Sequence, residues 1–213
     1  MDKRQIEKQI REGRGTFAGL HSLAKIVGAE MADGIMKQLN IDEGVSAEEA
    51  RQVIHPPLAK NHAYISEMAA AVIGAMYKRS GIGIKAISPK YNIDRENDLV
   101  EQAENAFLTR EAIEVLSLKV EDDSIRENAY ASENLGLETL VTRTYDGVGV
   151  HDGKDVCQWC IDRCGENMPL NEAYAKGAFE RHPGCGCELL YITRRGTERQ
   201  TDWTTNTWTR IRR

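Results

Sequence analysis

Cysteine is missing from the first 156 residues of this 213-residue chain, and aromatic residues make up only 6% of it. Few large side chains are therefore available for a core, but 41% of the residues are hydrophobic, which argues against general disorder. No apolar run approaches the ~18 residues of a membrane span. The chain opens on the charged stretch Met1-Asp-Lys-Arg4 rather than on an apolar signal sequence. We therefore expect a soluble protein made in the cytoplasm.

The net charge of −5 is unevenly distributed. Residues 188–213 hold six arginines against three acidic residues, so the rest of the chain is more acidic than the total indicates. An acidic body with a basic tail is not typical of a protein dedicated to duplex DNA, which needs a broad basic face. The tail itself carries the charge to contact phosphates or an acidic partner.

Apolar residues at helical spacing predict that residues 1–135 form a mainly helical region. A capping-box pattern begins one short helix at Ser46, and we expect that helix to end before Pro56, because a residue that precedes proline avoids the α conformation. The acidic run at 121–123 fits the start of a helix, where it complements the helix dipole. The predicted helices are 2–40 with a break near Gly13 and Gly15, 46–54, 58–79, 92–107, 110–118 and 121–134, and residues 81–89 are predicted to be extended.

The pattern changes after Gly136, where β-branched residues become frequent. Residues 137–145 and 188–193 are each predicted to be a strand. The sequence therefore predicts an α+β fold in three parts: the helical region 1–135, a small β-containing, cysteine-rich module 136–195, and a polar, basic tail 196–213.

The cysteines of that module are the strongest functional signal. An odd number of cysteines without a signal peptide argues against a disulfide framework. Cys157 and Cys160 form a C-x-x-C turn, which brings two sulfurs to one side of the chain and suits a tetrahedral metal. His182 and Cys185 can supply a second pair, and Cys187 can replace either of them. We expect a structural zinc ion held by four of these five residues.

Two other interpretations of the cysteines remain open. They are free buried thiols, or a redox-active C-x-x-C pair, although the βαβ context typical of thioredoxin is missing. Cys164 lies outside both pairs and is interpreted as a small core residue. The remaining histidines, at 21, 55, 62 and 151, show no ligand spacing and are interpreted as surface, packing or turn residues.

Three stretches of the sequence resemble one known family. The first is Val156-Cys-x-x-Cys160 followed by Gly165 and Phe179-Glu-Arg-His-Pro-x-Cys-x-Cys187. The other two are Gly81-Ile-Gly-Ile-Lys-Ala-Ile-x-Pro-Lys-x-Asn-x-Asp-Arg95 and Val120-Glu-Asp-Asp-Ser-Ile-Arg-Glu-Asn-Ala129. Together they resemble the phage Mu F-like minor head proteins, or head-morphogenesis proteins, in the forms found in phages and prophages of Gram-positive bacteria.

This resemblance spans about residues 80–190 and implies a minor structural protein of a bacteriophage virion. Such a protein lies inside the capsid, bound to the portal or the major capsid protein, and is assembled in the cytoplasm of the bacterial host. Its zinc would hold the fold rather than catalyse a reaction. The basic tail, with Trp203 and Trp208, could contact a virion partner or packaged DNA.

Two other functions compete with this one. A small HNH-like nuclease supported by zinc would need a catalytic histidine, with an asparagine or second histidine, around a hard cation. A zinc-finger adaptor would need a basic surface that the acidic body does not favour. No G-x-S-x-G, phosphate-binding glycine loop or H-E-x-x-H motif occurs in the chain, and we expect no enzymatic activity.

Overall fold

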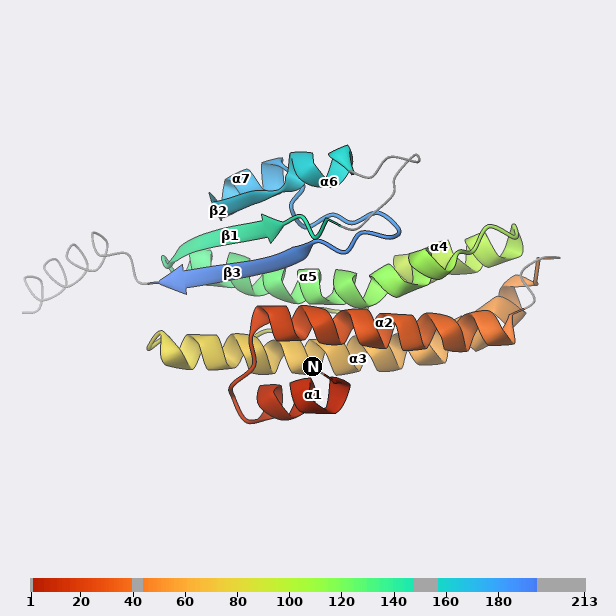
Figure 1. Ribbon diagram of the computed structural model, residues 1–213, viewed down its shortest axis with the longest axis horizontal. Coiled ribbons are helices and arrows are strands. Elements are labelled where there is room, and N and C mark those ends of the chain that lie inside the picture. Colours follow the sequence, from red (N-terminus) through yellow and green to blue (C-terminus); the bar gives the residue numbers. More distant parts are fainter. Residues whose placement is uncertain (1, 40–43, 148–156, 195–213) are drawn as a thin grey trace, which may run out of the picture.

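The computed structural model describes residues 2–39, 44–147 and 157–194 (Figure 1). In chain order the elements are α1 (Lys3–Arg11), α2 (Phe17–Gln38), α3 (Ala47–Arg79), α4 (Ile93–Glu104), α5 (Arg110–Asn134), β1 (Glu138–Thr144), α6 (Gln158–Arg163), β2 (Gly165–Pro169), α7 (Leu170–Ala175) and β3 (Glu188–Arg194). A five-helix region is followed by a three-stranded antiparallel sheet of order β2-β1-β3. This arrangement confirms the predicted α+β class.

Helix α5 occupies the middle of the molecule, between the sheet and the pair formed by α2 and α3 (Figure 1). The approach of α2 to α5 is close enough to require glycine at position 28. A Cβ atom there would lie 2.5 Å from the carbonyl oxygen of Glu114. On its other side α5 packs against β1 and β3, so one helix contacts both the helical layer and the sheet.

The sheet shares a hydrophobic core with the helices. Val141 of β1 and Leu189 of β3 are buried in one cluster with Ile73 of α3 and Ile125 of α5. The Tyr191 hydroxyl donates a hydrogen bond of 2.9 Å to that of Tyr77 within this core. The cysteine-rich module is therefore packed onto the helical region through buried apolar contacts.

Helix α3 contradicts the prediction that a helix ends before the two prolines. It runs without a break from Ala47 to Arg79, with Pro56 and Pro57 inside it. A proline in a helix interior costs about 3 kcal/mol or more, because it lacks the N–H and crowds the preceding turn. Ile54 and Leu58, on either side of the prolines, are both buried in the core. Burying each contributes about 1.5–3 kcal/mol, and this packing offsets the cost.

The predicted helices 110–118 and 121–134 are also one helix, α5, which ends at Asn134 just before Gly136. The acidic run 121–123 therefore lies in a helix interior, and its interpretation as a helix start is wrong. Residues 82–89, within the segment predicted to be extended, belong to no helix or strand. The backbone N–H and C=O of Ile87 pair with the side-chain amide of Asn128 at 2.8 and 2.7 Å.

Several other predicted elements are confirmed. They are the break between α1 and α2, the cap of α3 at Ser46, the helix predicted at 92–107, which is α4 with Asn92 as its cap and ends at Glu104, and the strands β1 and β3. Strand β2 and the short helices α6 and α7 were not predicted, because none is long enough to show a periodic pattern.

Candidate metal centre

Two short segments bring the predicted ligands together. Cys157 is the N-cap of α6 and Cys160 lies in its first turn, where its N–H bonds to the Cys157 carbonyl at 3.1 Å. The second segment, residues 182–187 before β3, is called the ligand loop here. It turns through a hydrogen bond from the Cys185 N–H to the His182 carbonyl at 3.1 Å, with Gly184 at a φ of 74°. Glycine adopts this left-handed conformation without strain.

All five predicted ligands gather in one cluster. Cys157, Cys160 and His182 have their ligand atoms within 4.8 Å of one another, and so do Cys160, Cys185 and Cys187. Cys160 belongs to both groups. All four cysteines are buried, and His182 is half-buried. Such a cluster of sulfur and imidazole ligands could hold a metal ion such as zinc.

Three separations within the cluster are close to the edges of a tetrahedral metal site, although the two ligand groups share only Cys160. The Nε2 atom of His182 lies 3.3 Å from the Cys157 sulfur and 3.1 Å from the Cys160 sulfur, and the sulfurs of Cys160 and Cys185 are 3.7 Å apart. Bond lengths of about 2.3 Å to sulfur and 2.0–2.1 Å to nitrogen imply tetrahedral edges of about 3.8 Å between two sulfurs and about 3.5 Å between sulfur and nitrogen. These three separations are therefore near those that an ion would require, whereas Cys185 and Cys187 would have to approach Cys157 and His182 to complete its coordination.

A contact with the backbone of the next residue orients the His182 ring for metal coordination. Its Nδ1 atom lies 2.6 Å from the carbonyl oxygen of Pro183, which can accept only a donated hydrogen. The proton therefore lies on Nδ1, and the lone pair of Nε2 faces the sulfurs. This arrangement is typical of metal-binding histidines. The Trp159 ring packs edge-on against the imidazole, with the ring centroids 5.0 Å apart.

Cys164 lies beside the cluster without belonging to either ligand group. Its side chain is half-buried and packs against the four clustered cysteines. Burial raises the pKa of its thiol, with smaller opposing effects from Arg143 and Cys187. These observations agree with its interpretation as a small packing residue.

Two buried arginines, which the sequence analysis did not single out, surround Cys185. Arg143 of β1 donates to the Cys185 sulfur at 3.3 Å and to the carbonyl oxygens of Ala178 and Glu180 at 2.7 and 2.5 Å. Arg181 lies 3.9 Å from the same sulfur and donates to the Cys187 carbonyl at 2.6 Å. A hydrogen bond from Cys187, followed by the charges of Arg181 and Arg143, lowers the pKa of Cys185 despite its burial.

The acidic run of α5, residues 121–123, provides the negative charges that pair with Arg181 and Arg95. Asp122 forms a two-pronged ion pair with Arg181, with one bond of 2.7 Å, and both side chains are almost inaccessible to solvent. Burial lowers the pKa of Arg181, but the adjacent carboxylate outweighs this effect and raises the pKa above its ordinary value. Asp123 pairs with Arg95 of α4 at 2.6 and 3.2 Å.

Glu121, the first residue of the run, reaches the ligand loop through a histidine. The His21 ring of α2 lies between them, with Nδ1 3.1 Å from Glu121 and Nε2 2.9 Å from the Gly186 carbonyl. Burial lowers the pKa of His21, but Glu121 outweighs that effect and raises it. The interpretation of His21 as an ordinary packing residue missed this bridge, because its partners lie 100 and 165 residues away.

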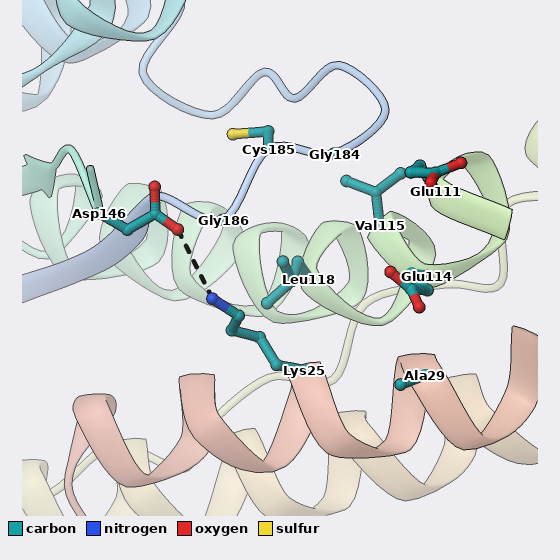
Figure 2. A pocket seen from close by; sticks show the side chains of 10 residues that line it. All are labelled: Lys25, Ala29, Glu111, Glu114, Val115, Leu118, Asp146, Gly184, Cys185 and Gly186. Carbon is teal, nitrogen blue, oxygen red and sulfur yellow. Dashed lines mark ion pairs between the residues drawn. The ribbon is translucent and has the colours of Figure 1, made fainter. Parts of the chain in front are cut away.

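A cavity of about 280 Å³ lies beside the ligand loop (Figure 2). Its walls come from α2, α5, Asp146 in the segment after β1 and the loop itself, and Lys25 faces Asp146 across it at 3.5 Å. Gly186 has no room for a side chain, since a Cβ atom would lie 2.0 Å from the Asp146 carboxylate. A side chain at this position would therefore displace the Asp146 carboxylate.

The other residues considered in the sequence take no part in the cluster. His55 bonds to the buried Glu96 at 2.7 Å, and His62 packs edge-on against Tyr91. His151 and the tail 196–213 lie outside the described residues. No helix within the described ranges is long and apolar enough to cross a membrane. Comparison of the chain with protein-family models, curated proteins and solved structures finds no match.

Proposed function

We propose that this chain is a minor head protein of a bacteriophage virion. It acts inside the capsid by binding the portal or major capsid protein, without enzymatic activity, and its Cys/His cluster holds a structural zinc ion. The observation that carries this proposal is the meeting of three separate sequence stretches at α5. They are the stretches on which the resemblance to the phage Mu F-like family rests.

Specific polar contacts join the stretch 120–129 to each of the other two. Ile87 of the stretch 81–95 pairs with Asn128 of the stretch 120–129 through two hydrogen bonds. The ion pair between Arg95 and Asp123 joins the same two stretches, and Arg181 connects the third stretch to Asp122. Enzyme motifs bring polar groups together around a substrate, whereas the polar groups of these residues form hydrogen bonds and ion pairs with one another inside the protein. Their use favours a structural role.

The chemistry of the cluster supports zinc. Thiolate and imidazole ligands suit zinc, whereas magnesium and calcium prefer oxygen ligands. Five candidate ligands are available for four positions, so no position needs to remain open for water or substrate. A closed, buried site of this kind contributes to folding rather than to catalysis.

The rival functions find less support. In the described residues of the module, His182 is the sole histidine, and it lies among sulfurs rather than near a hard cation. An HNH-like nuclease needs a further histidine or asparagine around such an ion. A zinc-finger adaptor needs a basic surface, and the described part of the module lies against the acidic run of α5. Contact with packaged DNA remains an expectation for the tail alone.

The test is the composition of purified particles. Phage particles produced by the genome that encodes this chain are separated on a density gradient and analysed by quantitative mass spectrometry. We expect the chain in a few copies per particle, and we expect the portal protein to co-purify with it from lysed heads. Particles that lack the chain would exclude the proposal.

A further inference from the structure

One histidine is bonded through both of its ring nitrogens and links three parts of the protein. The His21 ring of α2 has Nδ1 3.1 Å from a carboxylate oxygen of Glu121 on α5, and Nε2 2.9 Å from the Gly186 carbonyl in the ligand loop. His21 is 8% exposed and Glu121 is fully buried. The second carboxylate oxygen of Glu121 has no hydrogen-bond partner in the described part of the chain. The buried carboxyl group therefore depends on His21 for its hydrogen bond.

The protons of this bridge can be counted from its acceptors. A carbonyl oxygen only accepts a hydrogen bond, so Nε2 of His21 carries a hydrogen. Nδ1 then either carries a second hydrogen, which it donates to the Glu121 carboxylate, or accepts one from a protonated Glu121. Both forms contain one proton more than a neutral imidazole beside an ionised carboxylate. The two hydrogen bonds together therefore require an extra proton on the pair.

We propose that Glu121 and His21 form a pH-sensitive latch, which holds the ligand loop at Gly186 while the pair keeps its extra proton and releases the loop when that proton is lost. A neutral His21 has one ring hydrogen for two acceptors. The Glu121 carboxylate is the stronger acceptor because it is charged, so the hydrogen goes to Nδ1 and the Nε2 lone pair faces the Gly186 carbonyl. The proposal rests on this geometry, and on neither the virion role nor a bound metal.

The surroundings of the pair favour the protonated latch. Burial lowers the pKa of His21, but the hydrogen bond and charge of Glu121 outweigh this effect and raise the pKa above its ordinary value of 6.5. Burial is the main cause that raises the pKa of Glu121. A group whose pKa is raised by folding contributes stability below its ordinary pKa, and this contribution is lost as the pH rises through the raised value. The latch should therefore be closed near pH 6 and open on the alkaline side.

The charged groups near the pair have partners of their own. Asp122 of α5 and Arg181, just before the ligand loop, form the buried ion pair described above. The positive charge of Arg181 opposes the rise in the pKa of His21, although its effect is smaller than that of Glu121. Lys25, one turn further along α2, faces Asp146 at 3.5 Å.

The other elements packed around the pair contribute two tyrosines. Tyr191 of β3 donates to Tyr77, and Tyr64 of α3 donates to Glu7 of α1. Burial raises the pKa of Tyr191 and of Tyr64 above the ordinary value of 10.0, so neither phenol titrates between pH 6 and pH 9. The two cysteines beside Gly186 belong to the Cys/His cluster. Apolar side chains of α1 and α3 share a buried cluster with Leu20 and Leu23, the α2 residues near His21: Ile6, Ile10, Met68, Ala69 and Val72.

Release of the latch would change the cavity beside the loop. Gly186 lines this cavity together with Lys25 and Asp146 (Figure 2). A Cβ atom at Gly186 would lie 2.0 Å from the Asp146 carboxylate, so the loop is seated closely against its neighbours. The bond from His21 holds the backbone at this close approach, and its loss would loosen the loop on the helical layer.

The experiment measures hydrogen exchange in the full-length protein, in the presence of zinc and a reducing agent. Mass spectrometry follows peptides that cover residues 182–190 at pH 6, pH 7.5 and pH 9, and each rate is compared with the intrinsic rate at that pH to give a protection factor. We expect the protection factor of the ligand loop to fall by at least about tenfold from pH 6 to pH 9, because a hydrogen bond from a charged group is lost. Protection in α3 should stay constant. Release of a metal would act in the opposite direction, since acid protonates its ligands.

Two variants separate the latch from a general effect of pH. Glu121→Gln replaces the carboxylate with an amide of the same shape, whose N–H can donate to Nδ1 of a neutral His21. The Nε2 hydrogen then stays on the Gly186 carbonyl without an extra proton, so the loop should be equally protected at pH 6 and pH 9. The matched control is His55→Gln, which removes the bond of 2.7 Å between His55 and Glu96. It should keep the pH dependence of the wild type.

Two results would overturn the latch: a wild-type protection factor that does not change between pH 6 and pH 9, or the same fall in Glu121→Gln as in the wild type. If Glu121→Gln does not fold, ¹³C NMR of the histidine rings in the wild-type protein answers the question independently. We expect His21 to titrate above its ordinary pKa of 6.5, over the pH range in which the loop loses protection. Titration at or below that value would equally exclude the proposal.

Discussion

The ion pair between Asp122 and Arg181 allows a quantitative test of how α5 holds the module. Asp122→Asn keeps the shape of the side chain but removes its charge, which leaves the Arg181 guanidinium buried without a counter-charge. Breaking a buried pair in this way costs about 3–5 kcal/mol. That is a large part of the 5–15 kcal/mol typical of domain stability. The exposed pair of Glu172 and Lys176 provides the control, and Glu172→Gln should cost no more than about 0.5 kcal/mol.

A double variant separates the orphaned charge from other effects. Asp122→Asn combined with Arg181→Met removes both charges and leaves two neutral groups without their partner, the Cys187 carbonyl and the amide at position 122. An unpaired neutral group costs about 1–3 kcal/mol, less than an unpaired buried charge. The double variant should therefore be more stable than Asp122→Asn alone. Urea unfolding at pH 7 in the presence of zinc, followed by circular dichroism, measures the free energy of unfolding of the wild type, Asp122→Asn, Arg181→Met, the double variant and Glu172→Gln. A loss below 1 kcal/mol in Asp122→Asn, or additive losses in the double variant, would refute the reasoning.

Three further predictions concern the metal, acid stability and the tail. Protein purified under reducing conditions should contain about one zinc per chain by elemental analysis. Cys157→Ser should abolish zinc binding, whereas Cys164→Ser should retain it. Equal losses of zinc in the two variants would contradict Cys157 as a ligand and Cys164 as a packing residue. Burial raises the pKa of Glu96, but hydrogen bonds from Tyr91 and His55 outweigh this effect and lower the pKa. The contribution of Glu96 to stability is therefore present above about pH 4.5 and is lost as the pH falls below it. Acid unfolding curves should show a smaller loss of stability in Glu96→Gln than in wild type. Deletion of residues 196–213 should preserve folding and zinc content but reduce incorporation into particles, and normal incorporation would show that the tail is dispensable.

The ligand residues could be predicted because their geometry is local. A C-x-x-C turn brings Cys157 and Cys160 into one ligand group whatever the rest of the chain does, and the short loop 182–187 supplies the other three candidates. The strands β1 and β3 were equally predictable, since β-branched residues are frequent in β1 and β3 combines leucine, tyrosine, isoleucine and threonine in one short run. Neither inference required knowledge of long-range contacts.

The errors arose where long-range packing decides the outcome. The prolines of α3 and the acidic run of α5 both have local signals for a helix boundary, and tertiary contacts override both. Arg143 gave no signal at all in the sequence. It lies in an ordinary strand, and its partners Cys185 and Glu180 lie 42 and 37 residues further along the chain.

The three neighbouring carboxylates of α5 also have a consequence for synthesis of the chain. His21 and Arg95, which pair with Glu121 and Asp123, are made before α5, but Arg181 follows Asp122 by 59 residues. While only the helices have left the ribosome, Arg181 has not yet been made. Burial of the Asp122 carboxylate is then not compensated by a counter-charge. We expect the completed helical layer to stay loosely closed around Asp122 until the ligand loop leaves the ribosome, so that one late arginine completes the helical region and positions the metal loop in the same step.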